Sequence, residues 1–166
     1  MRVGARVVSS SKYEIECFGP DGKLKWREEF DNIVVTTGLN ILLDSTIKTG
    51  VSSPTWYVGL KGMGTMIAGD TMASHSGWSE IVPYSDANRP AFTSGSISAG
   101  AVDNSASKAV FNINATSTVY GCFLANNNTK SGTTGTLYGG GDFASSRAVV
   151  NGDTLNVTIT LTQTSA

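Results

Sequence analysis

Residues 152–162, GDTLNVTITLT, alternate apolar and polar positions without a break. The apolar positions are Leu155, Val157, Ile159 and Leu161. Successive side chains of a β-strand point to opposite faces, so this segment would present one apolar and one polar face. The alternation predicts a central or near-central strand of an antiparallel sheet over residues 153–162.

Shorter segments with strand character recur through the rest of the chain. They are WYVGLKG, WSEIVPY, RPAFTSG, KAVFNIN, STVYGCFLA, GTLYGGG and SRAVV. Turn residues separate them at intervals of about 8–12 residues, a spacing typical of β-sandwiches. We therefore expect a mainly β protein with a jelly-roll or β-sandwich fold.

A β-hairpin is predicted over KYEIECFGPDGKLKWREEF. Tyr13, Ile15 and Cys17 alternate with polar residues, and Leu24 and Trp26 continue the alternation on the return strand. Between them, GPDGK supplies Pro, Asp and Gly, the residue types that a tight turn favours.

The first twelve residues carry Arg2, Arg6 and Lys12 but no acidic residue. They form either a basic arm that binds a negatively charged partner or an ordinary first strand. We therefore divide the chain into this segment, residues 1–12, and one β-sandwich domain, residues 13–166. The three basic side chains are the candidate partner-binding residues.

After the hairpin, the spacing of the apolar residues changes. Ile33, Val34 and Val35 indicate a short buried strand, and one short helix is predicted near residues 37–47. Its apolar side chains fall near helical spacing, and we expect them to contact the core: Leu39, Leu42, Leu43 and Ile47. A single helical turn capped by Asp70 is predicted over DTMASH.

Composition limits the function classes. The chain has 166 residues, a net charge of -1 and only 15% charged residues, which argues against direct binding of nucleic acid or a membrane surface. It has no apolar run of about 20 residues, and MRVGARVVSSSK lacks the apolar core of a signal peptide. We therefore expect a reducing cytoplasm, with Cys17 and Cys122 as free buried thiols and no zinc site.

The only histidine lies in DTMASHSGWSE, beside two serines and between two acids. A nucleophilic site needs its base within hydrogen-bond reach of the nucleophile. Neighbouring residues point away from one another, so neither Ser74 nor Ser76 is well placed to meet the ring of His75. We expect His75 to bond backbone in a loop, with no catalytic residue, metal ligand or cofactor.

The remaining polar and aromatic candidates also favour structural roles. Residues 49–166 hold six acids, which we interpret as turn residues: Asp70, Glu80, Asp86, Asp103, Asp142 and Asp153. Five aromatic residues could form a sugar-binding platform or pack in the core: Trp56, Tyr57, Trp78, Tyr84 and Phe92. We favour the core for the two tryptophans.

A family resemblance rests on an ordered set of segments. They are GKLKWREEFDNIVVTTGLN, WYVGL, DTMASHSGWSE, YSDANRPAF, DNSASKAVFNINAT, GCFLANNNTKSGTTGTLY and NGDTLNVTITLT. The set resembles jelly-roll cement, or decoration, proteins of tailed-bacteriophage capsids, over about residues 12–162. The resemblance implies a homo-oligomer, expected to be a dimer, on a shell of major capsid protein. It carries over no active-site residue.

These observations predict a virion structural protein rather than an enzyme. It would bind and stabilise the major capsid protein shell from the capsid exterior, after assembly in the host cytoplasm. One alternative is a tail-fibre or receptor-binding module that grips carbohydrate. Another is a small hydrolase that uses His75.

Overall fold

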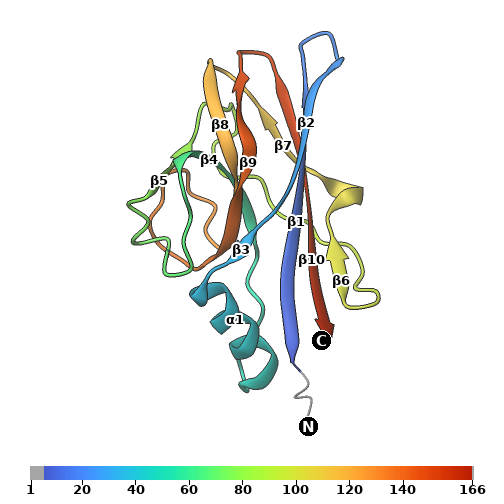
Figure 1. Cartoon of the computed structure of the whole chain (residues 1–166), viewed down its shortest axis with the longest axis vertical. Helices are drawn as coiled ribbons and strands as arrows, with labels where there is room; N and C mark the ends of the chain where they lie inside the picture. The colour runs from blue at the N-terminus through green and yellow to red at the C-terminus, as the bar shows by residue number, and fades with distance from the viewer. Residues whose placement is uncertain (1–5, 166) are drawn as a thin grey trace.

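A computed structural model describes residues 6–165, which form a β-sandwich with one α-helix (Figure 1). The mainly β class and the single short helix predicted from the sequence are confirmed. The elements in chain order are β1 (Val7–Phe18), β2 (Leu24–Asp31), β3 (Ile33–Val34), α1 (Thr36–Ile47), β4 (Tyr57–Gly64), β5 (Trp78–Ile81), β6 (Ala101–Asp103), a 3-10 turn (Ser105–Ser107), β7 (Ala109–Asn112), β8 (Ser117–Ala125), β9 (Leu137–Val149) and β10 (Thr154–Ser165).

The strands form two antiparallel sheets. Sheet A has the order β2-β1-β10-β6, and β7 also pairs with β10. Sheet B has the order β3-β9-β8-β4-β5. The strand predicted over residues 153–162 is β10, which pairs with β1 on one edge and with β6 and β7 on the other. Its near-central position is confirmed.

The main core lies between the sheets. The inward residues of β1 and β10 are fully buried in it: Tyr13, Ile15, Cys17, Leu155, Val157 and Ile159. They occupy every second position, so the period of two in the sequence corresponds to the buried face of sheet A.

A second, smaller core covers the outer face of sheet B. In β8, Cys122 and Leu124 belong to the main core, whereas Phe123 belongs to the second. Met66 and Met72, from the loop between β4 and β5, pack in the same cluster as Phe123. This loop is therefore a covering layer, and it builds the hollow described below.

The predicted hairpin is confirmed as β1 and β2, joined by a turn in which Gly22 has a φ of 74°. The first strand begins at Val7, so the boundary placed after Lys12 falls inside β1. Arg2 and the other residues before Arg6 lie outside the described part of the chain.

Several local predictions are wrong or incomplete. The segment DTMASH contains no helical turn, because backbone bonds between Thr71 and Ser74 close a tight loop there instead. RPAFTSG forms only an isolated bridge at Ala91, and GTLYGGG and SRAVV are parts of one strand, β9. The short β6 was not predicted.

The predicted core role of the helix side chains is confirmed for Leu42 and wrong for the other three. Gly38 is the buried residue of α1, and it packs against the backbone of Tyr138, where a Cβ atom would overlap the carbonyl group. Leu42 is partly buried against the main core. The other three apolar residues are exposed, because α1 contacts the sandwich through one narrow side: Leu39, Leu43 and Ile47.

Candidate functional site

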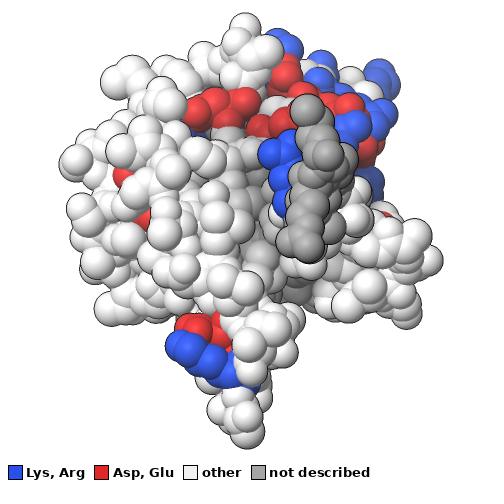
Figure 2. Space-filling model, turned by 60° about the horizontal axis from the view of Figure 1, so that its bottom comes forward, with Lys and Arg blue, Asp and Glu red and all other residues white. Residues whose placement is uncertain are grey.

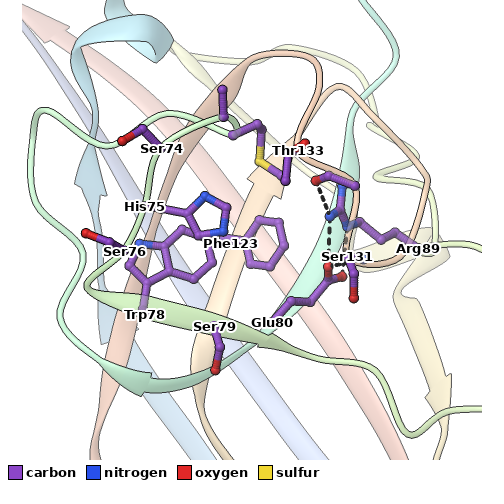
Figure 3. Close-up of a pocket in the computed structure, with 13 residues that line it drawn as sticks. Ser74, His75, Ser76, Trp78, Ser79, Glu80, Arg89, Phe123, Ser131 and Thr133 are labelled. Carbon is purple, nitrogen blue, oxygen red and sulfur yellow. Dashed lines mark hydrogen bonds and ion pairs between the residues drawn. The ribbon is translucent and has the colours of Figure 1, made fainter.

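A hollow of about 500 Å³ lies over the second core. Its walls come from the loop before β5, from β5 itself and from the loop between β8 and β9 (Figure 3). His75, Trp78 and Phe123 supply its aromatic side, and serine and threonine hydroxyl groups stand around it. We refer to this hollow as the His75 pocket.

His75 is held by its neighbours in the pocket wall. Its Nδ1 lies 3.0 Å from the carbonyl oxygen of Thr71, so Nδ1 carries the proton and donates it. The imidazole stacks on Trp78 with ring centroids 4.3 Å apart. The prediction that His75 bonds backbone in a loop is confirmed.

Neither neighbouring serine is placed to act as a nucleophile with His75. Ser74 and Ser76 point away from the imidazole in Figure 3. Asp70 is not a third member of a relay either, because its carboxylate accepts from the indole N–H of Trp78 at 2.9 Å and from the backbone N–H of Ile67. The segment contains the residue types of a catalytic site, but its serines and Asp70 are not placed to act together with His75.

The far wall of the pocket contains a buried ion pair. Arg89 is fully buried, and its Nε and one terminal nitrogen donate to the two oxygens of Glu80, each at 2.8 Å. The guanidinium also donates to the carbonyl oxygens of Asn127 and Gly132. The backbone N–H of Ser131 donates to Glu80. Arg89 thus joins β5 to the loop between β8 and β9.

A second buried cation lies in sheet B. The ammonium group of Lys61, in β4, donates to Asp142 of β9 and to the carbonyl oxygens of Gly62 and Gly64. These three acceptors match the three N–H bonds of an ammonium group. Lys61 is therefore a structural residue that holds the irregular end of β4 in contact with β9.

The two pairs correct the interpretation of the acids. Glu80 and Asp142 lie in strands and neutralise buried cations, so they are not turn residues. Asp153 does lie in a turn, where it accepts from the backbone N–H of Val150 and from Lys25. A signal was present in the sequence, since a basic residue inside an apolar strand such as WYVGLKG needs an acidic partner.

The aromatic residues pack mainly inside the protein. Trp78, Tyr84 and Phe92 are buried, and Trp56 is partly buried against Tyr138. The core role favoured for the two tryptophans is confirmed. These residues therefore do not form a flat aromatic platform, and the surface left for a ligand is the rim of the His75 pocket.

Many of the charged side chains lie on β1 and β2. In Figure 2 most of the charged side chains lie at the upper right, a smaller group lies at the bottom, and most of this face is uncharged. On β1 and β2 they form ion pairs, such as Lys12 with Glu29 at 2.6 Å and Arg27 with Glu14. Arg6 is exposed just before β1, six positions from Lys12, so the strand keeps these two candidate residues apart.

An apolar stripe is exposed on α1. Leu39, Leu43 and Ile47 follow each other at intervals of four residues, which places them on one side of the helix. Their exposed fractions are 44%, 62% and 78%. We call these three residues the α1 stripe. Contiguous exposed apolar surface of this kind is typical of interaction sites.

Both cysteines are buried free thiols, as predicted. Burial, and secondarily the charge of Asp153, raises the pKa of Cys17 to about 11. Burial alone raises the pKa of Cys122 still further. Since the thiolate is the reactive form, neither side chain is prepared for nucleophilic chemistry.

Within residues 6–165, no group of three or more His, Cys, Asp or Glu side chains is placed to hold a metal ion. No helix of that part of the chain is both long and apolar enough to cross a bilayer. Comparison of the chain with protein-family models, curated proteins and solved structures found no match.

Proposed function

We propose that this protein is a capsid cement, or decoration, protein of a tailed bacteriophage. It binds the major capsid protein shell from outside, stabilises that shell and associates with copies of itself. The sequence resemblance supports this proposal, and so does a β-sandwich whose His75, Cys17 and Cys122 all have structural roles. A protein of this kind works by burying surface rather than by chemistry.

The observation that carries the proposal is the α1 stripe. Its side chains are apolar and exposed on a helix whose own core contact is limited to one narrow side. Burial of apolar surface contributes about 25 cal/mol per Å². An interface of about 1,600 Å² in total is of standard size, and repetition over a shell multiplies the effect of each contact.

The experiment is sedimentation of the purified protein with empty capsids of the phage that encodes it. Ile47→Asp places a charge in the α1 stripe, at a side chain that is 78% exposed and whose loss leaves the core intact. The matched control is Ile97→Asp, because Ile97 is the same residue type and is 79% exposed elsewhere on the surface.

We expect the wild type and Ile97→Asp to sediment with capsids and Ile47→Asp to remain largely in the supernatant. Failure of the wild type to bind would contradict the cement function. Equal binding by both variants would contradict the role of the α1 stripe.

A carbohydrate-binding role is the second candidate, and the His75 pocket favours it. A sugar presents hydroxyl groups to polar partners and a C–H face to aromatic rings, and the pocket offers both kinds of surface. A glycan array tests this role directly. Binding that is abolished by His75→Ala and kept by Ile97→Asp would favour a receptor-binding module over a cement protein.

A further inference from the structure

The N-terminal half of β1 has one edge that no other part of the described chain pairs with. β2 pairs with β1 from Lys12 onward, and the chain then turns away at Asn32, whose N–H donates to the carbonyl oxygen of Ser11. On the opposite edge, β1 stays paired with β10 as far as Val7. Figure 1 shows β1 and β10 continuing past the end of β2.

The orientation of the backbone identifies the groups on this open edge. In an antiparallel strand, alternate residues direct their N–H and C=O groups to opposite edges. Ser11 faces the β2 side, so Ser9 and Val7 face it too. Gln163, opposite Ser9 in β10, donates its N–H to Gly100 on the far side, which agrees with this assignment.

This edge lacks the features that keep strand edges from pairing with other chains. Its residues, Val7, Val8, Ser9 and Ser10, include no charge and no proline. The adjoining edge strand β2 carries several charged residues. Val7 is 71% exposed and Val8 is 40% exposed, so apolar side chains accompany the open backbone groups.

We propose that this edge pairs with the same edge of a second copy of the chain. The pairing is antiparallel, about a two-fold axis at Val8, and it joins sheet A of one copy to sheet A of the other. It deepens the self-association in the proposed function by naming the surface involved.

The backbone restricts the possible registers to those in which groups on the open edge face each other. With Val8 opposite Val8 of the second copy, Ser9 faces Val7 of the second copy, and the reverse pair forms on the other side of the axis. Both are hydrogen-bonded pairs, which gives four new N–H to C=O bonds. The two Val8 side chains form a close cross-strand pair of β-branched residues. A shift of one residue would direct the free groups away from each other.

Charge complementarity supports the same register. Arg6 of the second copy would lie opposite Ser10, and Asp31 of β2 lies opposite Lys12. Both would therefore lie on the same side of β1, two residues apart along it. Two positions correspond to about 7 Å, within the reach of an arginine side chain. Arg6 and Asp31 are both exposed, and neither forms an ion pair among the described residues. The two-fold axis makes this contact twice.

The area is small. Four residues a side bury less than the about 800 Å² per partner of a standard interface. We therefore expect a dimer that forms and dissociates with protein concentration, and whose formation is favoured where a shell holds copies close together.

Disulfide trapping tests the register without capsids. In the proposed dimer the two copies of residue 8 form a close pair within disulfide range, whereas the two copies of residue 10 are four positions apart, about 13 Å. We expect Val8→Cys to give a covalent dimer under mild oxidation and Ser10→Cys to give none. The native cysteines are buried and contribute little background. Equal cross-linking of both variants, or of neither, would overturn the proposal.

Two further variants test the edge itself. Ser9→Pro removes an N–H that faces the open edge and leaves the bonds to β10 in place, so it should abolish the dimer in sedimentation velocity without a change in melting temperature. Arg6→Glu should weaken the dimer, and Asp31→Arg added to it should restore association. A wild type that stays monomeric at millimolar concentration, or a dimer that survives Ser9→Pro, would refute the edge. Either failure leaves capsid sedimentation as a separate result.

Discussion

Replacement of Arg89 by alanine should destabilise the protein more than any surface substitution. The side chain is fully buried and donates to Glu80, Asn127 and Gly132. Arg89→Ala would leave the carboxylate of Glu80, itself 6% exposed, without its cation. Breaking a buried ion pair by removing one partner typically costs about 3–5 kcal/mol.

This loss is large compared with the whole stability of a domain, about 5–15 kcal/mol. For a urea dependence of about 2 kcal/mol per M, it would lower the unfolding midpoint by about 2 M. The matched control is Lys48→Ala, which removes an exposed ion pair with Asp44 and should cost about 0.5 kcal/mol or less.

Urea unfolding followed by circular dichroism measures both variants. A double variant, Arg89→Met with Glu80→Met, should recover part of the stability, since it removes the orphaned charge together with its partner. A loss below about 1 kcal/mol in Arg89→Ala would refute the structural role assigned to the pair.

Four further outcomes can be checked together. Val157→Asp puts an unpaired charge into the main core and should cost several kcal/mol, and an unchanged melting temperature would contradict the placement of β10. Gly59→Ala should lower the melting temperature, because a Cβ there would overlap a buried aromatic ring of β8. Cys17 and Cys122 should resist a thiol reagent in the native protein and both react in denaturant. Because burial raises both thiol pKa values above 9.0, their contribution to the unfolding free energy is complete below pH 9 and should be lost as pH rises toward 11, as titration of urea unfolding would reveal.

The strands were predictable where one face is buried and the other faces solvent. In β10 and β1, residues such as Val157 and Ile15 occupy every second position in the sequence, and the same residues are buried in the core. The pattern failed where burial is two-sided or local. β9 carries three consecutive glycines, which hide a 13-residue strand from any hydrophobic period. The three residues of β6 are fixed by pairing with β10, which the sequence does not display.

The interaction features were harder to predict. The α1 stripe was taken for core, because an amphipathic pattern shows which helix face is apolar and not what covers it. The Glu80–Arg89 pair was missed because its members lie nine positions apart, in a strand and a loop that meet only in the folded protein. His75 was interpreted correctly, since geometry between chain neighbours is local and can be argued from the sequence.

The proposed function makes one claim that binding alone does not test, which is that the shell becomes more stable. Thermal disruption of empty capsids, followed by light scattering with and without the saturating protein, measures this directly. We expect the disruption temperature to rise with the wild type and with Ile97→Asp, and to rise much less with Ile47→Asp. An unchanged disruption temperature on capsids that carry the bound wild-type protein would contradict the cement function.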